Sequence, residues 1–171
     1  MSYRAQILII TDRQRIIGDD TDIVTMLSLT SEYGGTPALI EALTACQKYG
    51  LEQLGYYPHF IRTIAHAFLH GEYAYEEAGL GIMPYTQQLE RGVSVFDEPY
   101  SDLLKFFCSE EHYLPVIDLT DRNDEEPVLY LMPRISDHVD YRQYRKPGPD
   151  DIYPLTDEGL TKAIERIVWT D

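Results

Sequence analysis

Cysteine, basic side chains and long apolar runs are all scarce in this sequence. Its two cysteines, Cys46 and Cys108, are far apart, and we expect both to be free thiols in a reducing compartment. The N-terminal region offers only a four-residue apolar run at residues 7–10, which is too short for a secretory signal. Nothing approaches the roughly 18 consecutive apolar residues of a membrane span. These absences predict a cytoplasmic protein with no membrane partner.

Positive charge is outnumbered by negative charge. The 171 residues contain 14 Lys and Arg against 29 Asp and Glu, which gives a net charge of −15. An excess this large argues against direct binding to nucleic acid or to an anionic membrane, since both require surplus positive charge. Residues 1–85 carry a net −5 and residues 86–171 a net −10. Hydrophobic residues make up 44%, as in an ordinary folded domain rather than a disordered chain.

Sequence motifs for catalysis are also missing. No Gly-x-Ser-x-Gly nucleophile motif occurs, and Gly79 and Gly81 lack the third glycine or the Lys-hydroxyl pair of a phosphate-binding loop. Cys108 and His112 are close in sequence, but the acidic residues between them disfavour a thiolate. We therefore expect no catalytic residues and no cofactor, and we favour a protein that is not an enzyme.

The apolar pattern predicts one compact α+β domain over residues 1–171, with a small, mostly antiparallel sheet and about five helices. The first half, to about residue 71, is expected to be helix-rich, and the second half to mix strands and helices. Strands are predicted at residues 3–10, 93–96, 113–119 and 128–132. Helices are predicted at residues 21–32, 36–50, 58–71 and 156–169, with another opened by Pro99. The glycine- and proline-rich residues 71–92 and 133–154 are expected to be mostly irregular.

Tyrosine beside acidic residues is the most distinctive feature of the sequence. Tyr occurs 14 times against five Phe and one Trp. Tyr can bury its ring while its hydroxyl stays in water, which favours it at interfaces, and carboxylates around it attract a basic partner. We expect a non-enzymatic protein that binds and inhibits a basic, nucleic-acid-handling or toxin-like protein by imitating a phosphate backbone. Antitoxins, immunity proteins and phage-type inhibitors share this composition. The expected partner-binding residues are Glu72, Tyr73, Tyr75, Glu76, Glu77, Asp121, Asp124, Glu125 and Glu126.

Two alternatives remain open. His59, His66 and His70 fall on one face of the helix predicted at residues 58–71, and two imidazoles four residues apart can share a metal ion. Ala67 follows His66, however, where a metalloprotease would place its catalytic Glu. The second alternative is a homo-oligomer packed through its Tyr-rich surface.

Other charged tracts have simpler explanations. Asp19, Asp20 and Asp22 are expected to cap the helix predicted at residues 21–32. The basic, aromatic residues 141–146 are expected to pair with the nearby acids Asp137, Asp140 and Asp150 rather than with nucleic acid.

Overall fold

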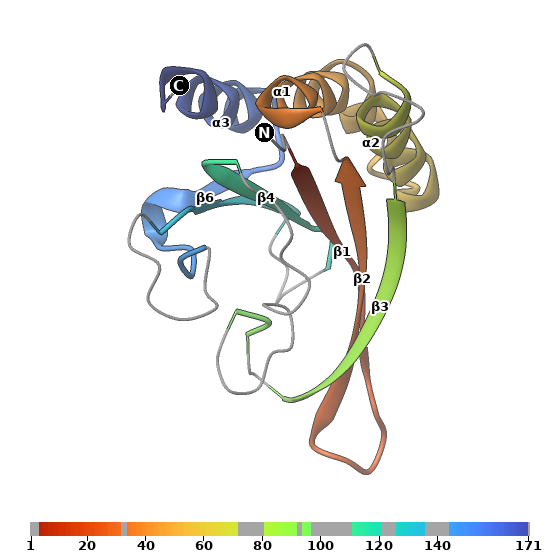
Figure 1. Ribbon diagram of the computed structural model, residues 1–171. Helices are drawn as coiled ribbons and strands as arrows, with labels where there is room; N and C mark the ends of the chain where they lie inside the picture. The colour runs from red at the N-terminus through yellow and green to blue at the C-terminus, as the bar shows by residue number, and fades with distance from the viewer. Residues whose placement is uncertain are drawn as a thin grey trace.

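The computed structural model describes residues 4–31, 34–71, 81–91, 94–96, 111–120, 126–135 and 144–170. Within them, six strands form one mixed sheet, and three α-helices cover one of its faces (Figure 1). The strands in chain order are β1 (Ala5–Arg15), β2 (Thr21–Ser31), β3 (Gly81–Glu90), β4 (Tyr113–Asp118), β5 (Val128–Pro133) and β6 (Ile152–Pro154). The helices are α1 (Gly35–Ala45), α2 (Tyr57–His70) and α3 (Asp157–Thr170). The protein is therefore a single α+β domain.

The sheet has the spatial order β3-β2-β1-β4-β5-β6. β1 and β4 run parallel, whereas the other neighbouring pairs are antiparallel. The strands predicted at residues 113–119 and 128–132 are confirmed as β4 and β5. The parallel pair makes the sheet mixed, a detail that the sequence did not predict.

The helix predicted at residues 21–32 is wrong, because residues 21–31 form strand β2. Burial along β2 alternates with the two-residue period of a strand, and Val24 and Met26 point into the core. Five of its residues are β-branched, which suits a pleated sheet better than a helix. Its pairing with β1 also extends that strand to Arg15, beyond the predicted end at Ile10.

The irregular segment predicted at residues 71–92 is wrong in its second half. Residues 81–90 form β3, which pairs with β2 from Gly81–Thr30 to Glu90–Thr21. β3 lies at the end of the strand order, and an edge strand tolerates Pro84 because a missing backbone N–H there breaks no pairing within the sheet.

The helices predicted at residues 36–50, 58–71 and 156–169 are confirmed as α1, α2 and α3. α1 continues through a π-helical turn to Gly50. The described residues contain three α-helices rather than about five, partly because residues 21–31 are a strand. The helix expected after Pro99 lies outside the described residues. The strand expected at residues 93–96 is not formed over residues 94–96, which make a turn.

Apolar side chains pack on both faces of the sheet. Ile7 and Ile9 of β1 face the three helices, where they join a cluster containing Leu43, Phe60 and Ile64. The alternate β1 residues Leu8 and Ile10 face the other way, in a second cluster with Val95 and Tyr144. Burial on both faces explains why β1 has an unbroken apolar run. None of the described helices is long and apolar enough to cross a membrane.

Candidate functional site

Most of the predicted partner-binding residues lie outside the part of the chain that the structure describes. These are Glu72, Tyr73, Tyr75, Glu76, Glu77, Asp121, Asp124 and Glu125. Glu126 is described, and it is an exposed residue just before β5. The prediction for both acidic sets therefore stays a prediction.

The strands nearest to the two sets, β3 and β4, are not neighbours in the sheet. The first set, residues 72–77, falls between Gly71 after α2 and Gly81 at the start of β3. The second, residues 121–126, begins after Thr120, which follows β4. β2 and β1 lie between β3 and β4 in the sheet. The start of β3 and the end of β4 are therefore at least three strand spacings of roughly 4.8 Å apart. The two acidic sets can therefore contact a partner independently, and each needs its own variant.

The chain's negative charge is concentrated outside the described residues. The described residues carry 15 acidic and 11 basic side chains, a net of −4, whereas the whole chain carries −15. Residues 34–71, which include α1 and α2, contain two acids and two bases. The undescribed segments thus account for −11, and among the described residues the α1–α2 surface is electrically balanced.

Two acidic residues in or beside the acidic stretches have structural roles. Asp118 is buried at the end of β4, where its Oδ1 accepts hydrogen bonds from the backbone N–H (2.9 Å) and the hydroxyl of Thr120. Asp22 pairs with Arg13 across the β1–β2 hairpin, with the Arg Nε 3.0 Å from Oδ2. The capping role expected for Asp19, Asp20 and Asp22 is wrong, because no helix follows them.

An ionic cluster around the buried carboxylate of Asp151 joins α3 to the segment before it, and the sequence did not predict it. Asp151 is 1% exposed, and its Oδ1 lies 2.8 Å from Nη2 of Arg166 on α3. Its Oδ2 lies 3.2 Å from Arg145 and accepts a hydrogen bond of 2.8 Å from the backbone N–H of Gly148. Arg145 of the basic stretch at residues 141–146 thus pairs within the chain, but with Asp151 rather than with the expected Asp137, Asp140 or Asp150. Asp151 itself belongs to the acidic Asp150-Asp151-Ile152-Tyr153 stretch, so this part of the Tyr-acid pattern is internal structure.

Arg166 makes further contacts within the same cluster. Its Nη1 donates to the carbonyl of Asp150 (3.0 Å) and to the Tyr153 hydroxyl (3.2 Å). Its guanidinium lies 5.1 Å from the centre of the Tyr113 ring, within cation–π range. Burial alone lowers the Arg166 pKa, but hydrogen bonds to Tyr153, Asp151 and Tyr113 outweigh this and raise the pKa above its usual value. Arg166 is therefore a permanent cation, and the contacts named above connect α3 to the rest of the fold.

The three histidines are exposed along the outer face of α2 but do not meet at one point. The rings of His66 and His70 have their centres 5.6 Å apart, whereas His59 packs on Tyr56 at 4.8 Å. Seven residues separate His59 from His66, which is about 10 Å along a helix. Among the described residues, no group of three or more His, Cys, Asp or Glu side chains could hold a metal ion. A metal site on this face would need a ligand from outside the described residues.

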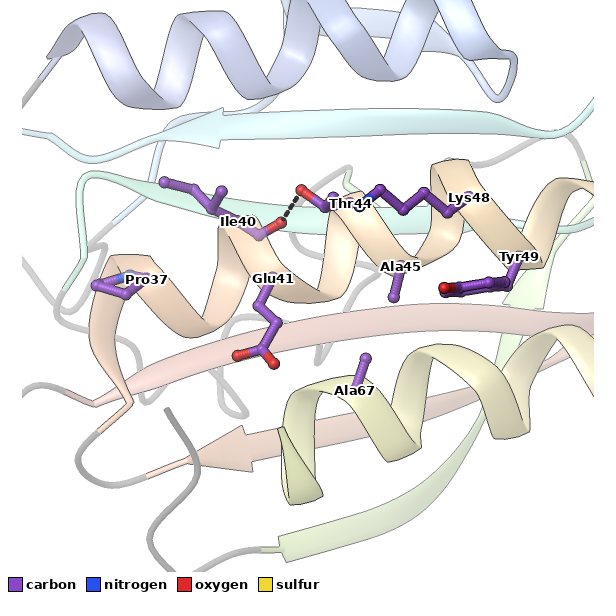
Figure 2. A pocket seen from close by; sticks show the side chains of 8 residues that line it. All are labelled: Pro37, Ile40, Glu41, Thr44, Ala45, Lys48, Tyr49 and Ala67. Atoms are coloured by element: carbon purple, nitrogen blue, oxygen red, sulfur yellow. Dashed lines mark hydrogen bonds between the residues drawn. The ribbon is translucent and has the colours of Figure 1, made fainter. Parts of the chain in front are cut away.

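A hollow of about 440 Å³ lies between α1 and α2 (Figure 2). The small side chains of Ala45 and Ala67 lie between the two helices, and Glu41, Lys48 and Tyr49 also line the hollow. Lys48 lies in the π-helical turn after α1, about two turns and about 10 Å along the axis from Glu41, which is too far for proton transfer between them. The charged groups of this hollow therefore do not form an acid–base pair.

Cys46 is a buried free thiol, as expected. Burial raises its pKa to about 12, so the thiol stays protonated and unreactive near neutral pH. Cys108 lies outside the described residues.

Comparison of the chain with protein-family models, curated proteins and solved structures found no match. Functional inference therefore depends on the charge, geometry and chemistry of this chain.

Proposed function

We propose that the protein is a cytoplasmic, non-enzymatic binding protein that docks on a basic protein partner and inhibits it. The observation that carries the proposal is the net charge of −15, of which −11 lies outside the described residues, with the tyrosine-containing stretches 72–80 and 97–110 contributing −3 each. A partner that handles nucleic acid has a groove lined by cations, and spaced carboxylates can occupy that groove as phosphates do. Tyr side chains would supply apolar contact area and hydrogen bonds within the same interface.

The described part of the chain supports this division of roles. Apolar side chains pack against both faces of the sheet, and the ionic cluster around Asp151 stabilises the fold. Side chains with these roles stabilise a scaffold. We assign recognition of the basic partner to the acidic segments between its strands and helices.

The first experiment is affinity capture from source-cell lysate at low and high salt, followed by mass spectrometry. A basic protein retained at low salt and released at high salt is the expected result, because salt screens attraction between exposed charges. That protein is then purified, and its affinity for the wild type is measured directly. Its nucleic-acid binding should fall as the acidic protein is added. Retention of no basic protein at low salt would refute the proposal.

Charge reversal then assigns the binding surface. One variant carries Glu72→Lys, Glu76→Lys and Glu77→Lys, and a second reverses Asp121, Asp124 and Glu125. The control reverses three exposed acids elsewhere, Glu52, Glu158 and Glu165, so that every variant changes the net charge equally. We expect at least a tenfold loss of affinity for a true contact set and a smaller loss for the control. Equal losses in all three variants would mean that only overall charge matters, and would remove both sets from the interface.

A further inference from the structure

A finger of three strands extends from the body of the sheet (Figure 1). We define the finger as residues 11–25 of β1, β2 and their connecting turn, together with residues 86–90 of β3. β4 ends where Asp118 pairs with Ile10, but β1 continues five residues further, to Arg15. Those five residues span about 17 Å of strand. A β-bulge between Ile10 and Asp12 marks the base of the finger, and bulges bend and twist the strands that contain them.

The finger is held rigid up to its tip. Arg13 and Asp22 form their ion pair across the hairpin, and the N–H of Ile16 donates to the carbonyl of Thr21 at 3.2 Å. Arg91, at the end of β3, donates its backbone N–H to the carbonyl of Asp20 at 2.8 Å. These contacts fix the turn without burying the carboxylates of its acidic residues: the Asp20 side chain is 99% exposed, although its Oδ1 lies 3.7 Å from Nη1 of Arg91 in an exposed ion pair.

Ile17 is the most exposed large apolar side chain among the described residues, at 98%. It occupies the second position of a turn in which the N–H of Asp19 donates to the carbonyl of Ile16, and Gly18 supplies the positive φ of 86°. A residue with a polar side chain could occupy the Ile17 position equally well, because only the glycine position has a special backbone requirement. Ile17 therefore contributes no packing to the folded monomer, and the rigid tip presents its apolar side chain to solvent.

We propose that this finger enters a concave, basic site on the protein partner, with Ile17 in an apolar pocket and Asp19 and Asp20 facing cations at its rim. The inference rests on the proposed function and names the structured element that takes part in it. The finger carries five acidic and two basic side chains, a net charge of −3, and Arg91 directly after it brings the sum to −2, so its charge complements a basic cleft. The same charge opposes tip-to-tip pairing of two copies. A preformed finger also loses little conformational freedom on binding.

The test compares Ile17→Ser with Trp169→Ser in the full chain. Trp169 is 85% exposed near the end of α3, so both substitutions remove a solvent-exposed apolar side chain and should leave the fold intact. Affinity is measured by calorimetry against the purified basic protein that the wild type retains at low salt. We expect Ile17→Ser to weaken binding tenfold to a hundredfold, about 1.4 to 2.8 kcal/mol, and Trp169→Ser to change it less than twofold.

Photo-crosslinking provides an independent measurement. p-Benzoylphenylalanine introduced at position 17 should crosslink to the basic partner, and the same probe at position 169 should not. Salt-sensitive partner binding that is unaffected by Ile17→Ser would overturn the finger inference while the proposed function stands. Crosslinks from position 17 to a second copy of this chain would also overturn it. If the wild type retains no basic protein, the proposed function fails, and the finger inference fails with it.

Discussion

Replacing Arg166 by methionine is expected to destabilise the protein by about 3 kcal/mol. The substitution keeps a long apolar stem and a good helix former, but it removes the cation beside the buried carboxylate of Asp151. Loss of a hydrogen bond to a charged group costs about 1.5–3 kcal/mol, and loss of the cation–π contact with Tyr113 costs about 0.5–1 kcal/mol. Breaking a buried ion pair typically costs about 3–5 kcal/mol. We expect a cost near the lower end of this range, because Asp151 keeps its contacts with Arg145 and the Gly148 N–H.

The assay is urea and thermal unfolding of the full chain, followed by circular dichroism. For a chain of this length, each 1 kcal/mol shifts the melting temperature by about 2–4 °C, so Arg166→Met should lower it by about 6–12 °C. Lys162→Met on the same helix is the matched control. Lys162 forms an exposed pair with Glu158 at 3.1 Å, and its loss should cost less than about 0.5 kcal/mol.

A double-mutant cycle tests whether the pair itself is responsible. Asp151→Asn and Arg166→Met together should destabilise the protein less than the sum of the single changes, by at least about 1 kcal/mol. Additive effects, or a cost for Arg166→Met no larger than that of Lys162→Met, would refute this account of the cluster.

Two further predictions concern a buried thiol and a close backbone contact. The Cys46 pKa is about 12 in the folded state, against an ordinary value of 9.0 for an exposed thiol. Between these pH values the unfolded chain has lost a proton that the folded chain retains, so stability falls with rising pH. The free energy of unfolding, measured in urea, should be about 2 kcal/mol lower at pH 10.5 than at pH 8.5 because of this thiol. Cys46→Ala should lack this contribution, and an identical pH dependence in the variant would contradict the prediction. Gly159→Ala should destabilise the protein by more than about 1 kcal/mol, because a Cβ at this position, near the start of α3, would lie 1.9 Å from the Pro154 carbonyl oxygen. An unchanged midpoint of urea unfolding would contradict that contact.

The sequence was a reliable guide where one local pattern dominated. The apolar stripe of Leu39, Ala42, Leu43 and Cys46, opened by Pro37, predicted α1, and all four of those side chains are buried. The same reasoning located α2 and α3, since a stripe at helical spacing must be buried against a neighbouring element.

Prediction from the sequence failed where the apolar residues fitted both the helical period and the two-residue period of a strand. Ile23, Met26 and Leu27 can form a helical stripe, yet residues 21–31 also alternate as a strand, and pairing with β1 and β3 decides in favour of the strand. β3 was hidden because residues 81–90 contain Gly81 and Pro84, and its hydrogen-bonding partner lies more than fifty residues earlier in the chain. Long-range pairing of this kind leaves little local signal.

The acidic character of the protein was determined by the sequence alone, because net charge is a sum over residues and does not depend on where each residue lies. The tertiary structure decided which charges are available to a partner. It buries Asp151 between Arg145 and Arg166, and it leaves Asp20 and Ile17 in solvent at the end of the finger. The physical reason is that the cost or benefit of a charge depends on its burial and on its neighbours, and both are set by contacts between residues distant in sequence.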